Sequence, residues 1–478
     1  MIYSERIFRE YDIRGIVGQD LTPDLAEQLG RAFGTTLRRK NARRIAVGRD
    51  GRESSPLLCQ RLIQGITSTG IGVTDVGVCP TPLLYFALFN LPVDGGVMIT
   101  ASHNPAEYNG FKLCVGKETL YGEDLQKLRR MIEARDFESG LPVPARPAGG
   151  GQAGAAPSVD SQEIIPSYLD YLKDAFRSVD ARGIKVVVDS GNAMGALAGP
   201  QALKNMGCEV IELYSELDSR FPNHHPDPTV ADNLKDLIES VRSKGADLGV
   251  AYDGDADRIG VVDERGEILW GDQLLVIFAR DILRRLPGAL ILSEVKASQV
   301  LYDDIRGRGG RALMWRAGHS LIKSKMKETG ASLAGEMSGH IFFADRYFGY
   351  DDAIYAGCRL VEILAESRQP VSGLLADLPK TSSTPEIRRD CSDDRKFVVV
   401  EKLKERFEAL RSRPTPDSIP IRDLITLDGV RIVFDDGWGL VRASNTQPAL
   451  VLRFEAETPG RMDKIRRFVE GELARIDS

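Results

Sequence analysis

The feature that most constrains the fold of this chain is a pattern that occurs three times along it. Each copy has an apolar strand, a polar corner, an amphipathic helix and a second apolar strand, and the copies span residues 43–77, 184–213 and 288–320. A strand, a helix and a second strand in this order predict a βαβ unit, and such units build largely parallel sheets that helices cover. Three copies therefore predict three similar α/β domains in tandem, with mixed, largely parallel sheets.

The C-terminal part of the chain follows a different pattern. From about Thr381, helical and strand-like segments alternate, and a last helix is expected from about Met462. This order predicts a smaller α+β domain with an antiparallel sheet. Between the first two units, residues 142–162 are rich in Pro, Gly and Ala, which predicts an exposed linker or loop. The expected domains are residues 1–160, 161–266, 267–380 and 381–478.

Length and charge narrow the class of protein, because 478 residues correspond to about three or four domains. The formal net charge of −6 provides no overall basic field for nucleic acid or for an anionic membrane. The N-terminus lacks the apolar core of a signal peptide, and no run approaches the roughly 18 apolar residues that a membrane helix needs. The six cysteines are scattered without a C-x-x-C pair, which favours reduced thiols. We therefore expect a cytoplasmic protein that binds neither nucleic acid nor membrane.

One serine stands in a polar corner directly after an apolar strand, in the stretch GGVMITASHNPAEYNGFKLC (95–114). Ser102 is followed by His103, and serine hydrolases use a serine nucleophile with a histidine base. Neighbours in an extended segment point to opposite faces, however, and no G-x-S-x-G elbow surrounds this serine. Because Asn104 and Pro105 favour turn initiation, this stretch taken alone predicts a turn that closes a strand.

A second polar corner, DGDADR, places Asp253, Asp255 and Asp257 at alternate positions between two apolar strands. In an extended or looped segment this spacing lets three carboxylates face one point, and oxygen ligands favour Mg²⁺ or Mn²⁺ over zinc. An acidic surface turn is the simpler alternative, but three convergent carboxylates repel each other unless a cation lies among them. An EF-hand does not fit, because its sixth position requires Gly where this chain has Arg258. Octahedral Mg²⁺ would need a further ligand, such as a phosphate on Ser102.

Further polar stretches carry weak signals when taken singly. RASNTQP (442–448) offers an arginine, hydroxyls and turn N–H groups to a phosphate, although a plain turn between strands looks similar. GEMSGH (335–340) offers a carboxylate, a hydroxyl and an imidazole to sugar hydroxyls, although a capping or turn role fits as well. Lys112 and His319, each considered alone, would be ordinary surface residues. No Walker A or G-x-G-x-x-G string occurs, so a nucleotide ligand is not indicated.

Taken together, these motifs resemble those of the α-D-phosphohexomutase family, in the family's order and over essentially the whole chain. The motifs that carry the resemblance are FREYDIRG (8–15), TASHNP (100–105), DGDADR (253–258), GEMSGH (335–340) and RASNTQP (442–448). With FPNHHPDP (221–228), they look most like the bacterial phosphomannomutase/phosphoglucomutase group. The phosphoglucosamine mutases tend to carry another residue in place of Met337 and Gly in place of Asn445. Ala193 stands where relatives often have Gly, which removes no expected contact.

The resemblance implies four domains around a central cleft and an enzyme that acts on hexose phosphates. Ser102 would be the phosphoserine that donates and recovers the phosphoryl group, with Mg²⁺ held by its phosphate and by Asp253, Asp255 and Asp257. Lys112 or His340 would be the general acid/base, and the sequence does not choose between them. The other residues that the resemblance implies are Tyr11 and Arg14 near the transferring group, Arg258, Lys296 and His319 at the substrate, Glu336 and Ser338 at sugar hydroxyls, and Arg442, Ser444, Asn445 and Thr446 at the second phosphate.

The expected reaction interconverts hexose 1-phosphate and hexose 6-phosphate, of mannose, glucose or both, through a 1,6-bisphosphate that reorients in the site. Glucose 1,6-bisphosphate or mannose 1,6-bisphosphate would be the activator, and the protein would be a monomer or a weak homo-oligomer. The same chemistry on glucosamine phosphate is an alternative. A silent sugar-phosphate-binding protein is another, although a binder needs no metal-bridged phosphoryl carrier. A metal-dependent phosphatase would instead release inorganic phosphate.

Overall fold

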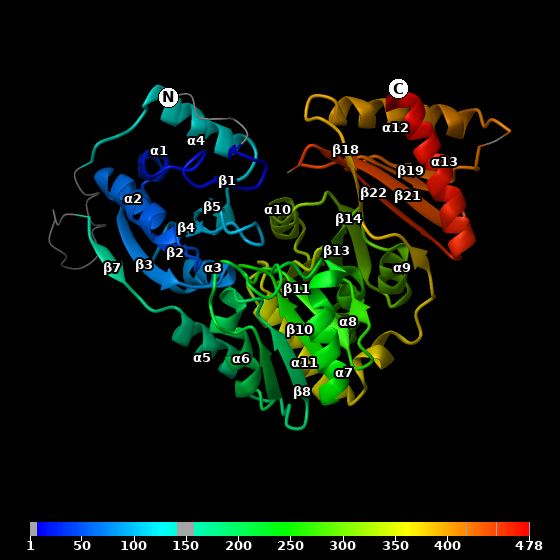
Figure 1. Ribbon diagram of the computed structural model, residues 1–478, viewed down its shortest axis with the longest axis horizontal. Helices are drawn as coiled ribbons and strands as arrows, with labels where there is room; N and C mark the ends of the chain where they lie inside the picture. Colours follow the sequence, from blue (N-terminus) through cyan, green and yellow to red (C-terminus); the bar gives the residue numbers. More distant parts are fainter. Residues whose placement is uncertain (1–6, 141–156, 417, 446, 478) are drawn as a thin grey trace.

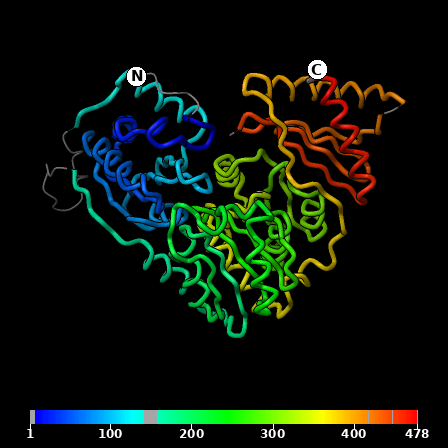
Figure 2. The backbone as a smooth tube through the Cα atoms, viewed as in Figure 1, coloured from blue at the N-terminus to red at the C-terminus, as the bar shows by residue number. Residues whose placement is uncertain are grey.

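A computed structural model describes residues 7–140, 157–416, 418–445 and 447–477. The described residues form four domains, with the first and last at opposite sides and the middle two between them (Figure 1). The tube in Figure 2 shows the chain passing from one side through the base to the other, so that the four domains surround a centre. The predicted linker at 142–162 lies mostly outside the described residues, and the domain boundaries stay predictions.

The first domain is a mixed sheet with helices on both faces. The strand order is β1-β5-β4-β2-β3-β7, with β6 beside β5, and β4, β2, β3 and β7 run parallel. Side chains alternate along β4, so that Val97 and Ile99 pack toward α1, α2 and α4 while Met98 packs toward α3. The elements are β1 (Ile13–Ile16), α1 (Pro23–Arg39), β2 (Arg44–Arg49), α2 (Ser55–Ser68), β3 (Gly72–Val78), α3 (Thr81–Asn90), β4 (Gly95–Ile99), β5 (Tyr108–Val115), β6 (Glu118–Thr119), α4 (Glu123–Ala134) and β7 (Val159–Ser161).

The second and third domains repeat the parallel βαβ arrangement on smaller sheets. Their strand orders are β12-β11-β10-β8-β9 and β14-β13-β15-β16. The second domain contains α5 (Ile165–Ala175), β8 (Lys185–Asp189), α6 (Gly199–Asn205), β9 (Glu209–Leu213), α7 (Lys235–Lys244), β10 (Leu248–Tyr252), β11 (Ile259–Asp263) and β12 (Ile268–Leu269). The third contains α8 (Gly271–Arg285), β13 (Leu290–Glu294), α9 (Gln299–Gly307), β14 (Arg311–Trp315), α10 (His319–Thr329), β15 (Leu333–Gly335), β16 (Ile341–Phe343) and α11 (Ala353–Ser367). The prediction of three similar α/β domains is confirmed.

The fourth domain is an antiparallel sheet covered by α12 and α13, as the sequence predicts. Helix α12 begins with a run of valines that favour strands, but Val399, Leu403 and Phe407 form an apolar stripe that packs on this sheet. The elements are β17 (Ser382–Ser383), β18 (Ile387–Asp390), α12 (Lys396–Ser412), β19 (Asp423–Ile425), β20 (Val430–Val433), β21 (Gly437–Ala443), β22 (Ala449–Ala456) and α13 (Pro459–Asp477).

Among the described residues, the first three domains share an apolar core that does not extend into the fourth. One continuous cluster joins α3 of the first domain to the second and third domains, through contacts such as that of Phe86 with Tyr168. The fourth domain has a core of its own. A small cluster of Val295, Trp438 and Leu440 packs between the third and fourth domains. The first three domains are therefore packed as one body, to which the fourth is attached.

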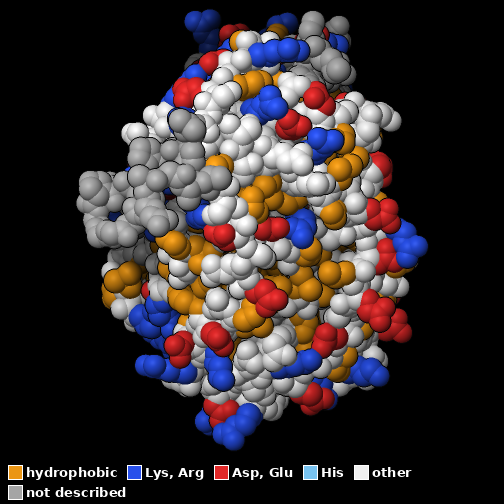
Figure 3. Space-filling model, turned by 90° about the vertical axis from the view of Figure 1, so that its left-hand side faces the viewer, with side chains coloured by type: hydrophobic (Ala, Val, Ile, Leu, Met, Phe, Trp, Pro, Cys, Tyr) orange, Lys and Arg blue, Asp and Glu red, His pale blue; other side chains and the backbone are white. Residues whose placement is uncertain are grey.

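The predicted polar corners follow strand ends. Ser102 comes after β4, Asp253 after β10, Lys296 after β13 and Ser444 after β21. In the first three domains these are the carboxyl ends of parallel strands, where α/β sheets bind ligands. On the face drawn in Figure 3, basic and acidic side chains are interspersed, so charge of one sign does not accumulate there. Within the described ranges, none of the helices is long and apolar enough to cross a bilayer.

Candidate active site

Ser102 lies in a turn that differs from the extended segment expected from the sequence. Its φ of +51° is in the left-handed region, and its Oγ lies 3.0 Å from Nδ1 of His103. The prediction that these two side chains point apart is therefore wrong, because it assumes an extended backbone and Ser102 lies in a turn with a left-handed φ. Ser102 Oγ also donates a hydrogen bond to Oδ2 of Asp253, at 2.7 Å. The serine thus faces the acidic corner of the second domain.

The acidic corner joins β10 to β11, and its three carboxylates converge as predicted. Asp253, Asp255 and Asp257 are at most 1% exposed, and one oxygen of each lies within 4.8 Å of the others. Gly254 allows the two loops to interlock, because a Cβ at this position would lie 2.1 Å from the carbonyl oxygen of Ser102. The phosphoryl-carrier candidate and the carboxylate cluster are therefore held against each other by their backbones.

The carboxylate cluster fits a divalent cation. Oδ1 of Asp255 is buried and accepts no hydrogen bond from any described residue, and a buried carboxylate oxygen without a donor is unfavourable. Burial, together with the charges of Asp257 and Asp255, raises the pKa of Asp253 well above its usual range. A hard cation among these oxygens would compensate the repulsion. The three aspartates therefore have the donor set that Mg²⁺ prefers.

Lys112 lies on β5 beside the acidic corner. Its Nζ donates to Oδ2 of Asp255 at 2.7 Å and to Oδ2 of Asp257 at 2.6 Å. Burial would lower the pKa of Lys112, but these two carboxylates raise it. The side chain is 2% exposed, so the interpretation of Lys112 as an ordinary surface residue is wrong. It is a buried cation that links the first and second domains.

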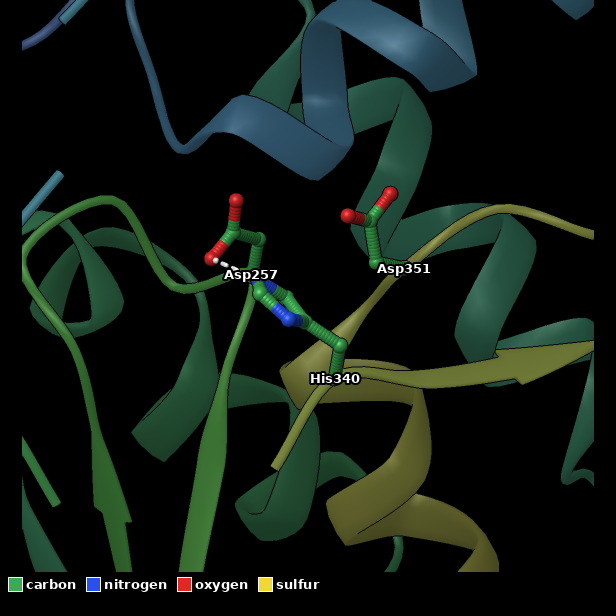
Figure 4. A group of neighbouring side chains, drawn as sticks. All are labelled: Asp257, His340 and Asp351. Atoms are coloured by element: carbon green, nitrogen blue, oxygen red, sulfur yellow. Dashed lines mark ion pairs between the residues drawn. The ribbon is translucent and has the colours of Figure 1, made fainter. Parts of the chain in front are cut away.

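His340 lies between carboxylates of two domains (Figure 4). Its Nδ1 is 2.8 Å from Oε2 of Glu336, and its Nε2 is 3.2 Å from Oδ1 of Asp257. Nε of Arg258 lies 3.2 Å from the same Nε2. Burial would lower the pKa of His340, but Asp257 raises it to about 9. Neutral Nε2 can accept from Arg258 and charged Nε2 can donate to Asp257, so this atom has a partner in both protonation states.

A third carboxylate, that of Asp351, faces the same imidazole (Figure 4). Lys323 Nζ donates to Oδ1 of Asp351 at 3.0 Å, and His319 Nδ1 lies 3.5 Å from its Oδ2. Lys323 is a cation that balances this carboxylate, whereas burial lowers the pKa of His319 well below its usual value and keeps that imidazole neutral. We therefore interpret the group of Asp257, His340 and Asp351 as a charge network around the imidazole of His340. His319 is 9% exposed at the start of α10 and is therefore not a surface residue either.

The remaining polar corners of the third domain face the same region. Lys296 Nζ is 3.1 Å from Oε2 of Glu386 and 3.4 Å from Oε1 of Glu294. Glu336 accepts from the backbone N–H of Gly318 at 2.7 Å through its Oε1. Ser338 Oγ lies 3.2 Å from Nδ1 of His340, beside Glu336. The structure therefore brings these predicted sugar-binding residues together.

The corner that carries Lys296 is held by arginines of the fourth domain. Nη1 of Arg431 donates to the carbonyl oxygens of Val295 at 2.7 Å and of Ala297 at 2.8 Å. Arg453 donates to the carbonyl oxygen of Lys296. The guanidinium carbon of Arg431 lies 3.7 Å from the ring centre of Trp438. These contacts fix the third domain to the fourth at this corner.

The RASNTQP loop reaches the first domain. Asn445 Nδ2 donates to the hydroxyl of Tyr11 at 2.6 Å, and that hydroxyl donates to the carbonyl oxygen of Ala317 at 2.9 Å. Burial raises the pKa of Tyr11, so the hydroxyl keeps its proton. Arg442 Nε donates to Oδ2 of Asp428 at 3.0 Å. Gln447 N donates to Oγ of Ser444 at 3.2 Å.

Arg14 contacts the loop that carries Ser102. Arg14 donates through Nη1 to Oδ1 of Asn104 at 2.8 Å and through Nη2 to Oδ2 of Asp12 at 2.5 Å, so it lies against the Ser102 loop. Thr446 falls outside the described residues. The other predicted site residues, from all four domains, converge on the region between Ser102 and His340.

Several residues of this region carry no motif in the sequence. Thr81 donates to Oδ2 of Asp255 at 2.6 Å, and its position after β3 is one more polar corner at a strand end, which is a usable signal. Lys323 and Asp351 come from the interior of α10 and the loop before α11, where nothing local distinguishes them. Asp428 and Glu386 reach Arg442 and Lys296 from other segments of the fourth domain.

Comparisons with known proteins agree with this arrangement. The chain matches family models described as phosphoglucomutase/phosphomannomutase α/β/α domains I, II and III and C-terminal domain, at residues 5–139, 166–266, 270–382 and 386–471 respectively. It is 47% identical to the phosphomannomutase/phosphoglucomutase of Pseudomonas aeruginosa over 472 residues, 99% of this chain and 96% of that protein. It is 45% identical to the phosphoglucomutase of Neisseria gonorrhoeae over 463 residues, 96% of this chain and 95% of that protein.

A solved structure gives the same result. The crystal structure of a phosphoglucomutase/phosphomannomutase family protein from Burkholderia thailandensis superposes with a TM-score of 0.89 at 39% identity. The match covers 100% of this chain and 98% of the other. The resemblance inferred from the five motifs is therefore confirmed over their whole span. With four matched domains and relatives of nearly equal length, the chain belongs to the α-D-phosphohexomutase family.

Proposed function

We propose that the protein interconverts hexose 1-phosphates and hexose 6-phosphates of mannose and glucose through a phosphorylated Ser102. The observation that carries this proposal is the 2.7 Å hydrogen bond from Ser102 Oγ to Asp253 at a buried cluster of three carboxylates. Relatives named phosphomannomutase/phosphoglucomutase support the substrate class. A cytoplasmic location and a monomeric or weakly oligomeric state are part of the same proposal.

Asp253, Asp255 and Asp257, with a phosphate on Ser102, are the residues that would hold Mg²⁺. Bound there, the cation would neutralise charge on the phosphoryl group and orient it for in-line transfer. Lys112 supports the same charge balance from the first domain, because its ammonium pairs with two of these carboxylates. Since those carboxylates hold the proton on Lys112, we assign it to charge stabilisation.

The first half of the proposed reaction breaks the bond between phosphorus and Ser102 Oγ and forms a bond between phosphorus and the free hydroxyl oxygen of the sugar. The proton of that hydroxyl passes to Nε2 of neutral His340, which Glu336 orients through Nδ1. Despite burial, Asp257 raises the pKa of this imidazole, and a cation bound at Asp257 would offset that effect and favour the neutral form. The product is a hexose 1,6-bisphosphate. In the second half, the other phosphoryl group returns to Ser102 Oγ, and Nε2 gives its proton to the sugar oxygen that is released.

Between the two halves, the bisphosphate must exchange its ends in the site. This exchange requires a phosphate site that accepts either end of the sugar, for which we propose the loop of Arg442, Ser444 and Asn445. The same chemistry makes glucose 1,6-bisphosphate or mannose 1,6-bisphosphate the expected activator, because either would phosphorylate Ser102 in resting enzyme.

The test of this proposal is kcat/KM for glucose 1-phosphate, mannose 1-phosphate and glucosamine 1-phosphate, with Mg²⁺ and a trace of glucose 1,6-bisphosphate. We expect turnover of the first two and little or none of the third. Turnover of glucosamine 1-phosphate alone would assign the protein to the amino-sugar mutases. Release of inorganic phosphate as the main product would indicate a phosphatase, and no reaction with any of the three would favour a sugar-phosphate-binding protein.

Replacing Arg442 with alanine should chiefly weaken substrate binding. Losing one charge-assisted phosphate contact is expected to raise KM by about 10- to 100-fold, with a smaller change in kcat. Steady-state kinetics with glucose 1-phosphate would measure both. Arg461→Ala is a matched control, because Arg461 lies on α13 of the same domain and pairs with Asp436. Unchanged kinetics in Arg442→Ala would assign its loop a purely structural role.

A further inference from the structure

The loop that carries Ser102 is bound by one buried side chain outside the motifs, that of Arg52. Arg52 follows β2 and is 3% exposed. Its Nη2 donates to the carbonyl oxygens of Ser102 at 2.9 Å and of Asn104 at 2.6 Å. Its Nη1 donates to the carbonyl oxygens of Pro105 at 2.6 Å and of Tyr108 at 3.1 Å. One guanidinium therefore binds four carbonyl oxygens, three from the loop between β4 and β5 and one from Tyr108, the first residue of β5.

The fifth donor of Arg52 connects this loop to the sheet. Its Nε donates to Oδ2 of Asp50 at 3.1 Å. Asp50 is itself held, because its N–H donates to the carbonyl oxygen of Ile99 on β4 at 2.9 Å. Its Oδ1 also accepts from Ser55 Oγ at 2.5 Å. The guanidinium therefore rests on the ends of β2 and β4, which belong to the parallel part of the sheet.

The number of N–H donors on Arg52 determines whether its side chain can also bind substrate. A guanidinium has five N–H donors, and all five have acceptors within the described residues: three on the loop, one at the start of β5 and one on Asp50. No donor is left for a phosphate or a sugar hydroxyl. The ring of Phe221, from the second domain, lies 5.5 Å from the guanidinium carbon. Arg52 therefore touches the loop backbone rather than the reacting atoms.

Ser102 needs such support because its own conformation is unfavourable. With φ at +51°, a serine is in a region that L residues rarely occupy, and it stays there when the surrounding structure fixes the chain. The carbonyl oxygens that Arg52 binds lie at this residue and just after it. Releasing them would allow the loop to relax toward ordinary backbone angles and would move Oγ away from Asp253.

We propose that Arg52 is a positioning residue for phosphoryl transfer, which holds the Ser102 loop so that Oγ points at the carboxylate cluster. This inference rests on the proposed function, in which Ser102 carries the phosphoryl group. It assigns a role to the segment DGRE (50–53) that follows β2. Its effect is expected on the rate of transfer and not on the affinity for sugar phosphate.

The test compares Arg52→Lys with the wild-type protein. An ammonium keeps the charge but has three donors, so at least two of the five hydrogen bonds are lost. We expect kcat for glucose 1-phosphate to fall by about 10- to 100-fold, because small misplacements of a reacting group have effects of this size. KM should stay within about twofold. The rate at which glucose 1,6-bisphosphate phosphorylates Ser102, followed by intact-protein mass spectrometry, should fall by the same factor as kcat.

Two further measurements separate positioning from a loss of folded protein. The final stoichiometry of phosphorylation should still reach that of wild type in Arg52→Lys, because a slower site still fills. Arg49→Lys is the matched control, since Arg49 ends the same strand and pairs with Asp75 away from the loop. It should retain wild-type rates.

If Arg52→Lys does not fold, Asp50→Asn keeps the inference testable. This variant weakens the support of Arg52 and should lower kcat and the phosphorylation rate together, at unchanged KM. Wild-type rates in folded Arg52→Lys, or in Asp50→Asn, would overturn the inference while leaving the mutase function intact. Absence of turnover and of Ser102 phosphorylation in the wild-type protein would instead overturn the proposed function.

Discussion

Turnover of hexose phosphates is expected to fall by on the order of 10⁴- to 10⁶-fold when Ser102 is replaced with alanine, the scale seen when an enzyme loses its nucleophile. The change removes the oxygen that would form and break the bond to phosphorus. The fold should persist, because the contacts that hold this residue run through its backbone. Its N–H donates to Thr100 Oγ1 at 2.9 Å, and its carbonyl oxygen accepts from Arg52.

A coupled assay for glucose 6-phosphate would measure the loss, and incubation with glucose 1,6-bisphosphate would show whether the protein gains the mass of one phosphate. The wild-type chain should gain it and Ser102→Ala should not. Ser68→Ala, at the end of α2, is a control that should keep full activity, since Ser68 Oγ donates within its own helix to Gly65. Normal turnover in Ser102→Ala would remove this serine as the phosphoryl carrier.

Replacing Asp255 with asparagine should lower kcat on the order of 10³-fold and weaken Mg²⁺ binding. Asp255 combines a buried oxygen that accepts no hydrogen bond within the described residues with contacts to Lys112 and Thr81. The substitution removes one negative charge from the site that the cation would occupy. Chelation of divalent cations should stop the wild-type enzyme, and added Mg²⁺ should restore it.

Thermal unfolding provides a readout that does not depend on catalysis. A ligand that binds the native state raises the melting temperature, so Mg²⁺ should stabilise the wild-type protein more than Asp255→Asn. Asp232→Asn is the control, because Asp232 is an exposed carboxylate of the same domain that pairs with Lys235. Equal stabilisation by Mg²⁺ in all three proteins would show that the cation does not bind at this corner.

The fold could be predicted largely from the sequence because its determinants are local. Alternating or continuous apolar runs identify strands such as β8 and β13, and the helices between them close βαβ units whose topology is strongly restricted. The corners after strands could be predicted for the same reason, since a parallel sheet gathers them at one edge. The convergence of the three carboxylates at the acidic corner is predictable on the same ground.

The rest of the site depends on contacts between distant segments. Arg52 meets a loop fifty residues further along the chain, and Tyr11 meets Asn445 across 434 residues. Nothing in the local pattern of either segment encodes such a contact. The contact between Ser102 and His103 could not be predicted for a different reason. Serine rarely adopts a left-handed φ, so the sequence favours an extended backbone at Ser102, in which the two side chains point apart.

The Tyr11 hydroxyl is a weak connection between three of the four domains. It joins the first, third and fourth domains through two neutral hydrogen bonds, to Asn445 and to Ala317, and the net worth of such a bond is about 1 kcal/mol. Thermal fluctuations readily break hydrogen bonds of that strength. The shared core beneath Ser102 and the carboxylates does not depend on these two bonds, and Arg431, which stacks on Trp438 and donates to the carbonyl oxygens of Val295 and Ala297, still joins the fourth domain to the third without them. A movement of the fourth domain that breaks the two hydrogen bonds of Tyr11 would therefore leave the carboxylate cluster and the core beneath it intact.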